Sequence, residues 1–170
     1  MVEDGIIEPC ISPWNSPLLA VLKKDKTIRL VNNFSTGLND KLIRCNYPIA
    51  PMRQIFAKIS SCIATLRERY PTENIIYSQF DLKNGYSSLS IIDSKRDMTS
   101  FIYGDRQVRY ARLSQGLSLS PAVFQKFMHL TFYGTDKKAD FYEMFNYIDD
   151  WALCSIESRH MEALSSIFYK

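Results

Sequence analysis

The segment FNYIDDWALCS, from Phe145 to Ser155, predicts a β-hairpin with acidic side chains at its tip. The stretches Phe145–Tyr147 and Trp151–Ser155 are rich in aromatic and other apolar residues, which favour strands. Asp149-Asp150 lies between them, and aspartate side chains favour tight turns because they hydrogen-bond to the nearby backbone. The hairpin would therefore carry two adjacent carboxylates at its turn.

A second strand, from Ile75 to Phe80, leads to another aspartate, Asp81. A turn at Lys83-Asn84-Gly85 follows directly. If one antiparallel sheet pairs this strand with the hairpin, Asp81 and Asp149 come together although they lie far apart in the sequence. The sequence thus predicts a sheet edge at which carboxylates converge.

The other elements are predicted from apolar periodicity and turn residues. Strands are expected at Leu18–Lys23 and Thr27–Asn33, joined at Asp25-Lys26, and at Thr99–Tyr103 and Gln107–Arg112, joined at Gly104-Asp105; helices are expected at Met52–Leu66, from Pro121 with Ser120 as N-cap, and from about Ser158. Prolines at positions 9, 13 and 17 predict an irregular, extended segment from Glu8 to Pro17. This order of elements indicates an α+β fold, with helices packed on one face of an antiparallel sheet.

Each expected helix has an apolar stripe that should face the core. The stripes are Ile55, Ile59, Ile63 and Leu66 in the first helix, Phe124, Phe127 and Met128 in the second, and Met161, Leu164 and Phe168 in the third.

Composition sets wider limits. A chain of 170 residues with 46% hydrophobic side chains can form one compact domain, and the net charge of +3 is too small to identify a polyanionic partner. The four cysteines are widely spaced without a CxxC pair, which argues against zinc and for free thiols in a reducing compartment. The sequence contains no run of about 18 apolar residues, so no membrane helix is expected.

Converging carboxylates are the ligands that a pair of divalent cations requires, because hard cations bind oxygen. Two such ions can activate an attacking oxygen and stabilise a leaving one during phosphoryl transfer. The plainer alternative is that Asp81 caps a turn and Asp149-Asp150 is an ordinary polar hairpin tip. For either site alone the plainer alternative is favoured, and the flanking residues change that balance.

Several motifs, in order along the chain, resemble the reverse transcriptases of retroviruses and long-terminal-repeat retrotransposons. They are Gly5-Ile6-Ile7-Glu8-Pro9 with Ser12-Pro13-Trp14-Asn15-Ser16-Pro17, the basic hairpin from Lys23 to Arg29, Phe80-Asp81-Leu82-Lys83-Asn84-Gly85-Tyr86, Leu113-Ser114-Gln115-Gly116-Leu117 with Ser120-Pro121-Ala122-Val123-Phe124-Gln125, and Tyr147-Ile148-Asp149-Asp150. Each motif alone is weak, but five of them in the family's order are specific.

The resemblance implies an RNA-directed DNA polymerase that adds deoxynucleotides to a primer 3′-hydroxyl. It implies that Asp81 and Asp149 bridge two Mg²⁺ ions, with Mn²⁺ as an alternative, and that Asp150 and the Leu82 carbonyl assist. It also implies a palm with a partial fingers subdomain over residues 1–170.

The resemblance also implies a nucleotide pocket formed by Lys23, Arg29, Asn84, Gly85, Tyr86, Gln115 and Gly116. Lys23 and Arg29 would hold the triphosphate, and Tyr86 would exclude a 2′-hydroxyl. Each has a plainer alternative, namely a solvated basic hairpin for Lys23 and Arg29 and a core tyrosine for Tyr86.

The sequence departs from the family in two places. Asn33 and Ser35 stand where the family usually has an acidic residue and an arginine, so an ion pair is expected to be lost. The family also continues into a primer grip, a thumb and commonly a ribonuclease H domain, so we expect a domain truncated before the thumb. The remainder of a Pol polyprotein, a template with primer and dNTPs are then the expected partners, inside the cell in cytoplasmic virus-like particles or the nucleus and without membrane contact.

Two other functions stay open at this stage. The chain could be a catalytically silent remnant, or a nucleic-acid-binding protein, that keeps the palm fold. It could also be another palm-fold enzyme, such as an RNA-directed RNA polymerase or a nucleotide cyclase, although Tyr86 and Gln115-Gly116 argue against that alternative.

Overall fold

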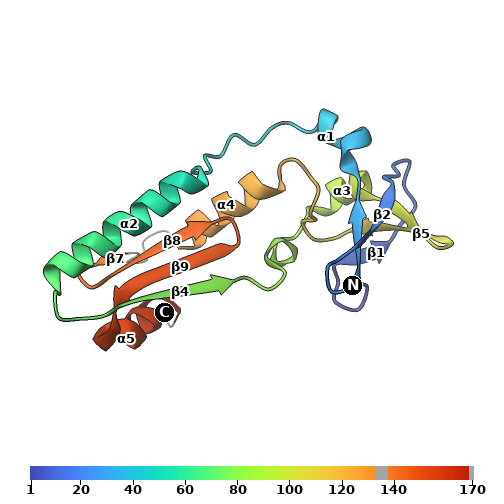
Figure 1. Ribbon diagram of the computed structural model, residues 1–170. Coiled ribbons are helices and arrows are strands. Elements are labelled where there is room, and N and C mark those ends of the chain that lie inside the picture. Colours follow the sequence, from blue (N-terminus) through green and yellow to red (C-terminus); the bar gives the residue numbers. More distant parts are fainter. Residues whose placement is uncertain (133–137, 169–170) are drawn as a thin grey trace. The chain divides into compact units, whose positions relative to one another are not determined.

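The computed structural model describes residues 1–132 and 138–168. The chain divides into two compact units, each assembled from two separate stretches of sequence. The first unit comprises Met1–Asn46 and Asn84–Phe124, and the second comprises Tyr47–Lys83 and Gln125–Lys170. The ribbon in Figure 1 follows the chain through both.

The first unit contains a three-stranded antiparallel sheet and a separate hairpin. The sheet has the order β1-β6-β5, with β1 at Ile7–Pro9, β5 at Phe101–Tyr103 and β6 at Arg106–Tyr110, and the hairpin pairs β2 (Leu18–Leu22) with β3 (Ile28–Asn32). Short helices complete it: η1 (Phe34–Thr36), α1 (Leu38–Lys41), η2 (Gly85–Ser88), α3 (Asp93–Arg96) and η3 (Asp97–Thr99). The four strands expected here are confirmed.

The structure adds strand β1, where an irregular segment was expected. Ile7 pairs with Tyr110 and Pro9 with Val108, and the Cys10 N–H donates to the Gln107 carbonyl (3.1 Å). Pro9 is tolerated because it ends an edge strand, where a missing donor disrupts no neighbouring pair.

An ion network ties β1 to β6 and to the turn before β5. Arg109 contacts Glu8 (2.7 Å), Asp93 (2.8 Å) and Asp97 (2.7 Å), and Arg96 contacts Glu8 (3.1 Å). Burial raises the pKa of Glu8, but hydrogen bonds from Arg96 and Arg109 outweigh it. The pKa of Glu8 therefore lies below its ordinary value of 4.5.

The second unit is built on a four-stranded antiparallel sheet of order β4-β9-β8-β7. Its strands are β4 (Ile75–Asp81), β7 (Lys138–Ala139), β8 (Tyr142–Tyr147) and β9 (Asp150–Ile156), and its helices are α2 (Met52–Arg69), η4 (Glu157–Arg159) and α5 (His160–Phe168). Helix α4 (Ser120–Thr131) passes from the first unit into the second.

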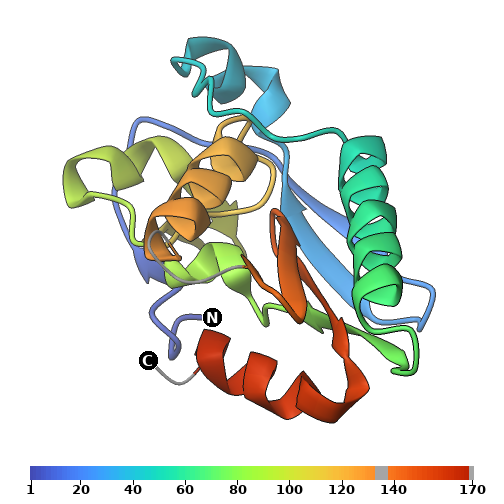
Figure 2. The ribbon, with the colours of Figure 1, turned by 90° about the vertical axis from the view of Figure 1, so that its left-hand side faces the viewer.

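Helices α2 and α5 lie on opposite faces of this sheet, as Figures 1 and 2 both show. On one face, Cys62 and Leu66 of α2 are buried against the strands. On the other, the rings of Phe80 and Phe168 lie 5.4 Å apart, and His160 hydrogen-bonds to Ser78 (2.8 Å). The α+β class is confirmed, but the helices are not confined to one face.

The burial of β9 explains why both faces are covered. Every residue from Trp151 to Ile156 is buried, so the strand has apolar side chains on both sides. Such a strand needs packing partners on each face, as the central strands of a parallel sheet do.

Three details of the expected helices are corrected. Helix α4 begins at Ser120, so Ser120 is its first residue, and the Ser120 hydroxyl donates to the Ser114 carbonyl (2.7 Å). Phe127 is 39% exposed, whereas Phe124 and Met128 are buried as expected. Helix α5 buries Ala163 and Ile167, while Met161 of the expected stripe is 71% exposed.

Candidate active site

The three aspartates come together at one end of the second unit's sheet. In the register of β4 and β9, Asp81 is the direct partner of Asp150. The Leu82 N–H donates to the Asp149 carbonyl (3.3 Å), so the backbone beyond β4 continues to pair with the turn. Directly opposed residues place their Cβ atoms about 5 Å apart on the same face. Strand pairing therefore brings Asp81 next to Asp150, whereas the convergence of Asp81 with Asp149 stays a prediction.

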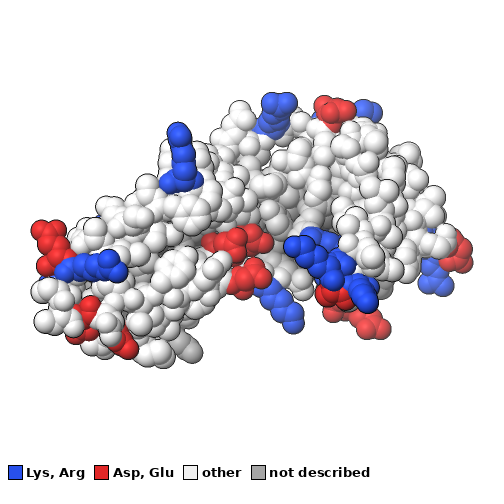
Figure 3. All heavy atoms as spheres, viewed as in Figure 1, with Lys and Arg blue, Asp and Glu red and all other residues white. Residues whose placement is uncertain are grey.

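Acidic atoms gather in Figure 3 at the place where Figure 1 shows the β8–β9 turn and the end of β4. Within the described residues, Asp81, Asp149 and Asp150 form no ion pair with a lysine or arginine. Opposed like charges destabilise a strand pair. A bound cation would relieve that repulsion.

The turn itself differs from the expected one. Its central residues are Ile148 and Asp149, because Asp150 already belongs to β9. Ile148 has a φ of 55°, a left-handed conformation that costs a β-branched residue energy. Its N–H donates to Oε1 of Gln125 on α4 (2.8 Å), which helps to hold the strained backbone in place. Gln125 stood in a family motif, but the sequence assigned it no role.

The donor atoms suit a hard divalent cation, since carboxylate and carbonyl oxygens are what such ions bind. Asp81 and Asp150 provide a facing pair, and Asp149 follows in the turn. Among the residues that the structure describes, no group of three His, Cys, Asp or Glu side chains is arranged to hold a metal ion. The suitability of these aspartates for a divalent cation therefore rests on their oxygen donors and on the pairing register of β4 and β9.

A second group of predicted residues surrounds a cavity in the first unit. The cavity has a volume of ≈ 570 Å³, and five of the predicted nucleotide-pocket residues line it: Lys23, Arg29, Asn84, Tyr86 and Gln115. Gly85 and Gly116 are the chain neighbours of these residues. A basic hairpin, a tyrosine and a polar loop thus meet around one cavity.

The floor of this cavity is shaped by the turn that leaves β4. Asn84 has a φ of 56°, and asparagine is one of the few residues that readily adopt the left-handed region. Short helix η2 begins next, at the buried Gly85. Tyr86 follows half-buried, with its ring centroid 5.0 Å from that of Phe124. Phe124 therefore backs the ring of Tyr86.

The loop that carries Gln115 is held by contacts that the sequence did not reveal. Nδ2 of Asn39 donates to the Gly116 carbonyl (3.0 Å), and Oδ1 of Asn39 accepts from the Ser118 N–H (2.9 Å). Gly116 has a φ of 94°, and a Cβ there would lie 3.0 Å from the Asn32 carbonyl oxygen. Asn39 and the close approach to β3 therefore fix this loop.

Asn32 and Tyr110 form a buried polar pair in the cavity wall. Asn32 is 2% exposed and Tyr110 is 8% exposed. The Tyr110 hydroxyl donates to Oδ1 of Asn32 (2.9 Å), whereas Nδ2 of Asn32 is buried with no hydrogen-bond partner. Burial raises the pKa of Tyr110, so its hydroxyl stays protonated as the donor.

Asn33 and Ser35, which differ from the residues usual in the family, hydrogen-bond to each other. Oδ1 of Asn33 accepts from both the N–H and the hydroxyl of Ser35, which caps short helix η1. A neutral turn therefore stands at these positions, where we expected the family's ion pair to be lost.

Comparisons with known proteins agree with this geometry. A family model described as "Reverse transcriptase (RNA-dependent DNA polymerase)" matches residues 21–170. The "Retrovirus-related Pol polyprotein from transposon 412" of Drosophila melanogaster is 30% identical over 177 residues, which is 100% of this chain and 13% of that protein. The corresponding polyprotein from transposon gypsy, of the same organism, is 30% identical over 132 residues, or 74% of this chain and 12% of that protein. The chain thus spans about an eighth of these relatives.

Solved structures show the same fold. The native crystal structure of prototype foamy virus protease-reverse transcriptase matches with a TM-score of 0.71 and 22% identity, covering 98% of this chain and 20% of that one. The foamy viral protein in complex with dsDNA gives a TM-score of 0.76 at 21% identity, covering 98% of this chain and 31% of that one. Separately, none of the described helices combines the length and apolar character needed to cross a bilayer.

Proposed function

Because the chain belongs to the reverse transcriptase (RNA-dependent DNA polymerase) family, we propose that it catalyses RNA-directed DNA synthesis at Asp81, Asp149 and Asp150. The observation that carries this proposal is the β4–β9 register, which makes Asp81 and Asp150 direct partners beside the turn that contains Asp149. Among the described residues no lysine or arginine forms an ion pair with these aspartates, and carboxylate oxygens are the ligands that divalent cations prefer.

In the proposed mechanism, Asp81, Asp149, Asp150 and the Leu82 carbonyl would hold two Mg²⁺ ions. When bound, such ions lower the pKa of the attacking primer hydroxyl and neutralise the charge of the leaving pyrophosphate. Mn²⁺ could replace Mg²⁺ because it also prefers carboxylate oxygens. The Gln125 contact to Ile148 then serves to keep the strained turn, and with it Asp149, in one position.

We propose that the ≈ 570 Å³ cavity of the first unit receives the dNTP. Lys23 would bind the triphosphate as a point charge and Arg29 as a planar fork. Tyr86, backed by Phe124, would occupy the space of a 2′-hydroxyl, while Asn84, Gly85, Gln115 and Gly116 would supply backbone and amide contacts.

The proposal extends to the protein of which such a domain forms a part. We propose that residues 1–170 are fingers and palm, and that a primer grip, thumb and ribonuclease H belong to the rest of a Pol polyprotein. The curated relatives are named as Pol polyproteins. One solved relative is described in complex with an RNA/DNA hybrid and another with dsDNA. A template with annealed primer is the corresponding partner here.

Primer extension on an RNA template with Mg²⁺ and dNTPs tests the catalytic assignment. Asp149→Asn should abolish extension, whereas Asp105→Asn, at a 93% exposed carboxylate, should leave it unchanged. Mn²⁺ binding, followed by its paramagnetic resonance signal, provides a readout that does not need a thumb. If the folded wild-type chain neither extends a primer nor binds Mn²⁺ more tightly than Asp149→Asn, the chain is a silent palm-fold protein instead.

The identity of the substrate is tested at Tyr86. Tyr86→Ala should increase the incorporation of ribonucleotides relative to deoxynucleotides, because the smaller side chain leaves room for the 2′-hydroxyl. Tyr86→Phe keeps the ring and should preserve discrimination. An unchanged ratio in Tyr86→Ala would rule out the role of this residue as a sugar gate.

A further inference from the structure

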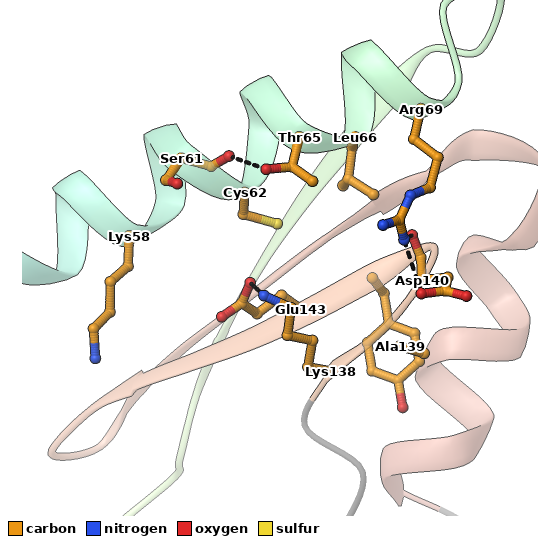
Figure 4. Close-up of a pocket in the computed structure, with 11 residues that line it drawn as sticks. Lys58, Ser61, Cys62, Thr65, Leu66, Arg69, Lys138, Ala139, Asp140 and Glu143 are labelled. Atoms are coloured by element: carbon orange, nitrogen blue, oxygen red, sulfur yellow. Dashed lines mark hydrogen bonds and ion pairs between the residues drawn. The ribbon is translucent and has the colours of Figure 1, made fainter.

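A cavity of ≈ 350 Å³ lies between helix α2 and strands β7 and β8 of the second unit, away from the three aspartates in sequence and in strand register. Figure 4 shows Cys62 on the α2 side of this cavity and Glu143 on the strand side. The carboxylate of Glu143 is held by Nζ of Lys138 at 3.1 Å. One thiol and one acidic group therefore line the same cavity.

A second thiol, that of Cys154, lies on strand β9 next to Glu143. In the register of β8 and β9, Glu143 is the direct partner of Cys154, so their side chains lie next to each other on the same face of the sheet. Cys62 is buried against that face. Cys62 of α2 and Cys154 of β9 thus both lie next to Glu143, although they come from distant parts of the sequence. All four cysteines, including Cys10 and Cys45, are free in this structure.

We propose that Cys62 and Cys154 form an oxidation site, at which a peroxide converts the two thiols into a disulfide that joins α2 to β9. Helix α2 and β9 already pack together, so the bond forms between elements that are in place. This site goes beyond the proposed polymerase function and does not depend on it.

The reaction has two steps. The sulfur of Cys62 attacks the O–O bond of hydrogen peroxide, takes one hydroxyl as a sulfenic acid, and the leaving hydroxide combines with the thiol proton as water. The sulfur of Cys154 then attacks the Cys62 sulfur, and the displaced hydroxyl leaves with the Cys154 proton as a second water. Two thiols are oxidised and one peroxide is reduced, so atoms and electrons balance.

The surroundings assign the order of the two steps. Cys62 lines the cavity, whereas Cys154 is 0% exposed, so peroxide reaches Cys62 first. The hydrogen bond from Cys154 lowers the pKa of Cys62 against the opposing effect of burial. The same contact and burial raise the pKa of Cys154, which keeps it protonated until it attacks. A thiolate is the species that reacts with peroxide, so Cys62 is the attacking group.

Peptide mapping of the oxidised chain tests this proposal. The folded chain is treated with limiting hydrogen peroxide, free thiols are blocked with N-ethylmaleimide, and the unreduced digest is analysed by mass spectrometry. We expect a linked peptide pair that contains Cys62 and Cys154, with Cys10 and Cys45 alkylated. Both of these are more exposed than Cys62, so random oxidation would modify them first and would overturn the proposal.

Single substitutions separate the two roles. In Cys154→Ser the sulfenic acid on Cys62 should persist and be trapped by dimedone, whereas in Cys62→Ser the remaining Cys154 should resist peroxide. Circular dichroism checks that each variant is folded, and Cys154→Ala replaces Cys154→Ser if the serine is not tolerated at the buried site. Dimedone labelling of Cys154 in Cys62→Ser, at the rate seen for Cys62 in Cys154→Ser, would also contradict the proposed order.

Discussion

Removing the hydroxyl of Tyr110 should destabilise the fold by more than the loss of one exposed tyrosine hydroxyl. Asn32 is 2% exposed, its Nδ2 has no partner, and its Oδ1 accepts a hydrogen bond from the Tyr110 hydroxyl. Tyr110→Phe therefore leaves the amide buried without that hydrogen bond. An unsatisfied buried polar group costs about 1–3 kcal/mol, and we expect Tyr110→Phe to lower the free energy of unfolding by that amount.

Asn32→Val should be destabilising by a similar amount on its own, because it removes the acceptor of the Tyr110 hydroxyl. The double variant should be close to the wild type, since replacing both partners by apolar groups of similar shape can be nearly neutral. Valine also suits the end of strand β3. The two substitutions should therefore compensate each other in a double-mutant cycle.

Urea unfolding followed by far-UV circular dichroism measures all four proteins of the cycle, with Tyr103→Phe as control. Tyr103 is 59% exposed, and its hydroxyl should contribute within about 0.5 kcal/mol. A cost of Tyr110→Phe equal to that of Tyr103→Phe would refute the reasoning. So would a double variant whose loss equals the sum of the two single losses, because then the pair would not be coupled.

Three further changes test other parts of the structure. Gly116→Ala should destabilise by about 1–3 kcal/mol in urea unfolding, and by more than Gly104→Ala, because both have positive φ but only Gly116 approaches other backbone within 4 Å; equal costs would argue against the close approach. Gln125→Ala should speed hydrogen exchange of the Ile148 amide about fivefold or more, as expected from losing about 1 kcal/mol of hydrogen bonding, and unchanged protection would contradict the contact. The pKa of Glu8 is lowered in the fold, so its stabilisation is present above pH 4.5 and is lost as the pH falls through the lower folded value. Glu8→Gln should therefore reduce the difference in unfolding free energy between about pH 6 and about pH 3, and an equal difference in both proteins would contradict the network.

Much of the second unit could be predicted, because its strands have strong local signals. The strand at β4 and the hairpin of β8 and β9 were expected from composition, and their pairing places Asp81 opposite Asp150. The turn was misplaced by one residue, since aspartate favours turns whereas isoleucine disfavours the left-handed backbone that Ile148 adopts. No local preference would have selected Ile148, because the pairing of Asp81 with Asp150 fixes the turn from outside.

The buried face of α5 shows a second limit. Met161, Leu164 and Phe168 are in helical phase, and so are Ala163 and Ile167. Periodicity alone cannot choose between two overlapping stripes, and the strands that the helix meets select the one with the smaller residue. The prediction that Phe127 is buried was wrong for a related reason, since an apolar residue beside a buried face can still be partly exposed.

The candidate nucleotide pocket was predicted as a set of residues, and five of them line one cavity. Its supporting contacts were not predicted. Asn39 reaches Gly116 and Ser118 across a long stretch of chain, and Asn32 meets Tyr110 in the same way. Such contacts leave no periodic or local signal, because asparagine at these positions has many other plausible uses.

Because each unit is built from two stretches of sequence, neither unit can be completed until its second stretch has been synthesised. The first unit lacks β5 and β6 until residues up to 110 have left the ribosome. Among the described strands β4 pairs with β9 alone, and β9 is made later still. Strand β4 therefore spends that interval with its hydrogen-bonding groups unpaired, and such edges are where nascent chains associate wrongly. Chaperone binding during translation should accordingly concentrate on the stretch that contains β4, and should end once β9 emerges.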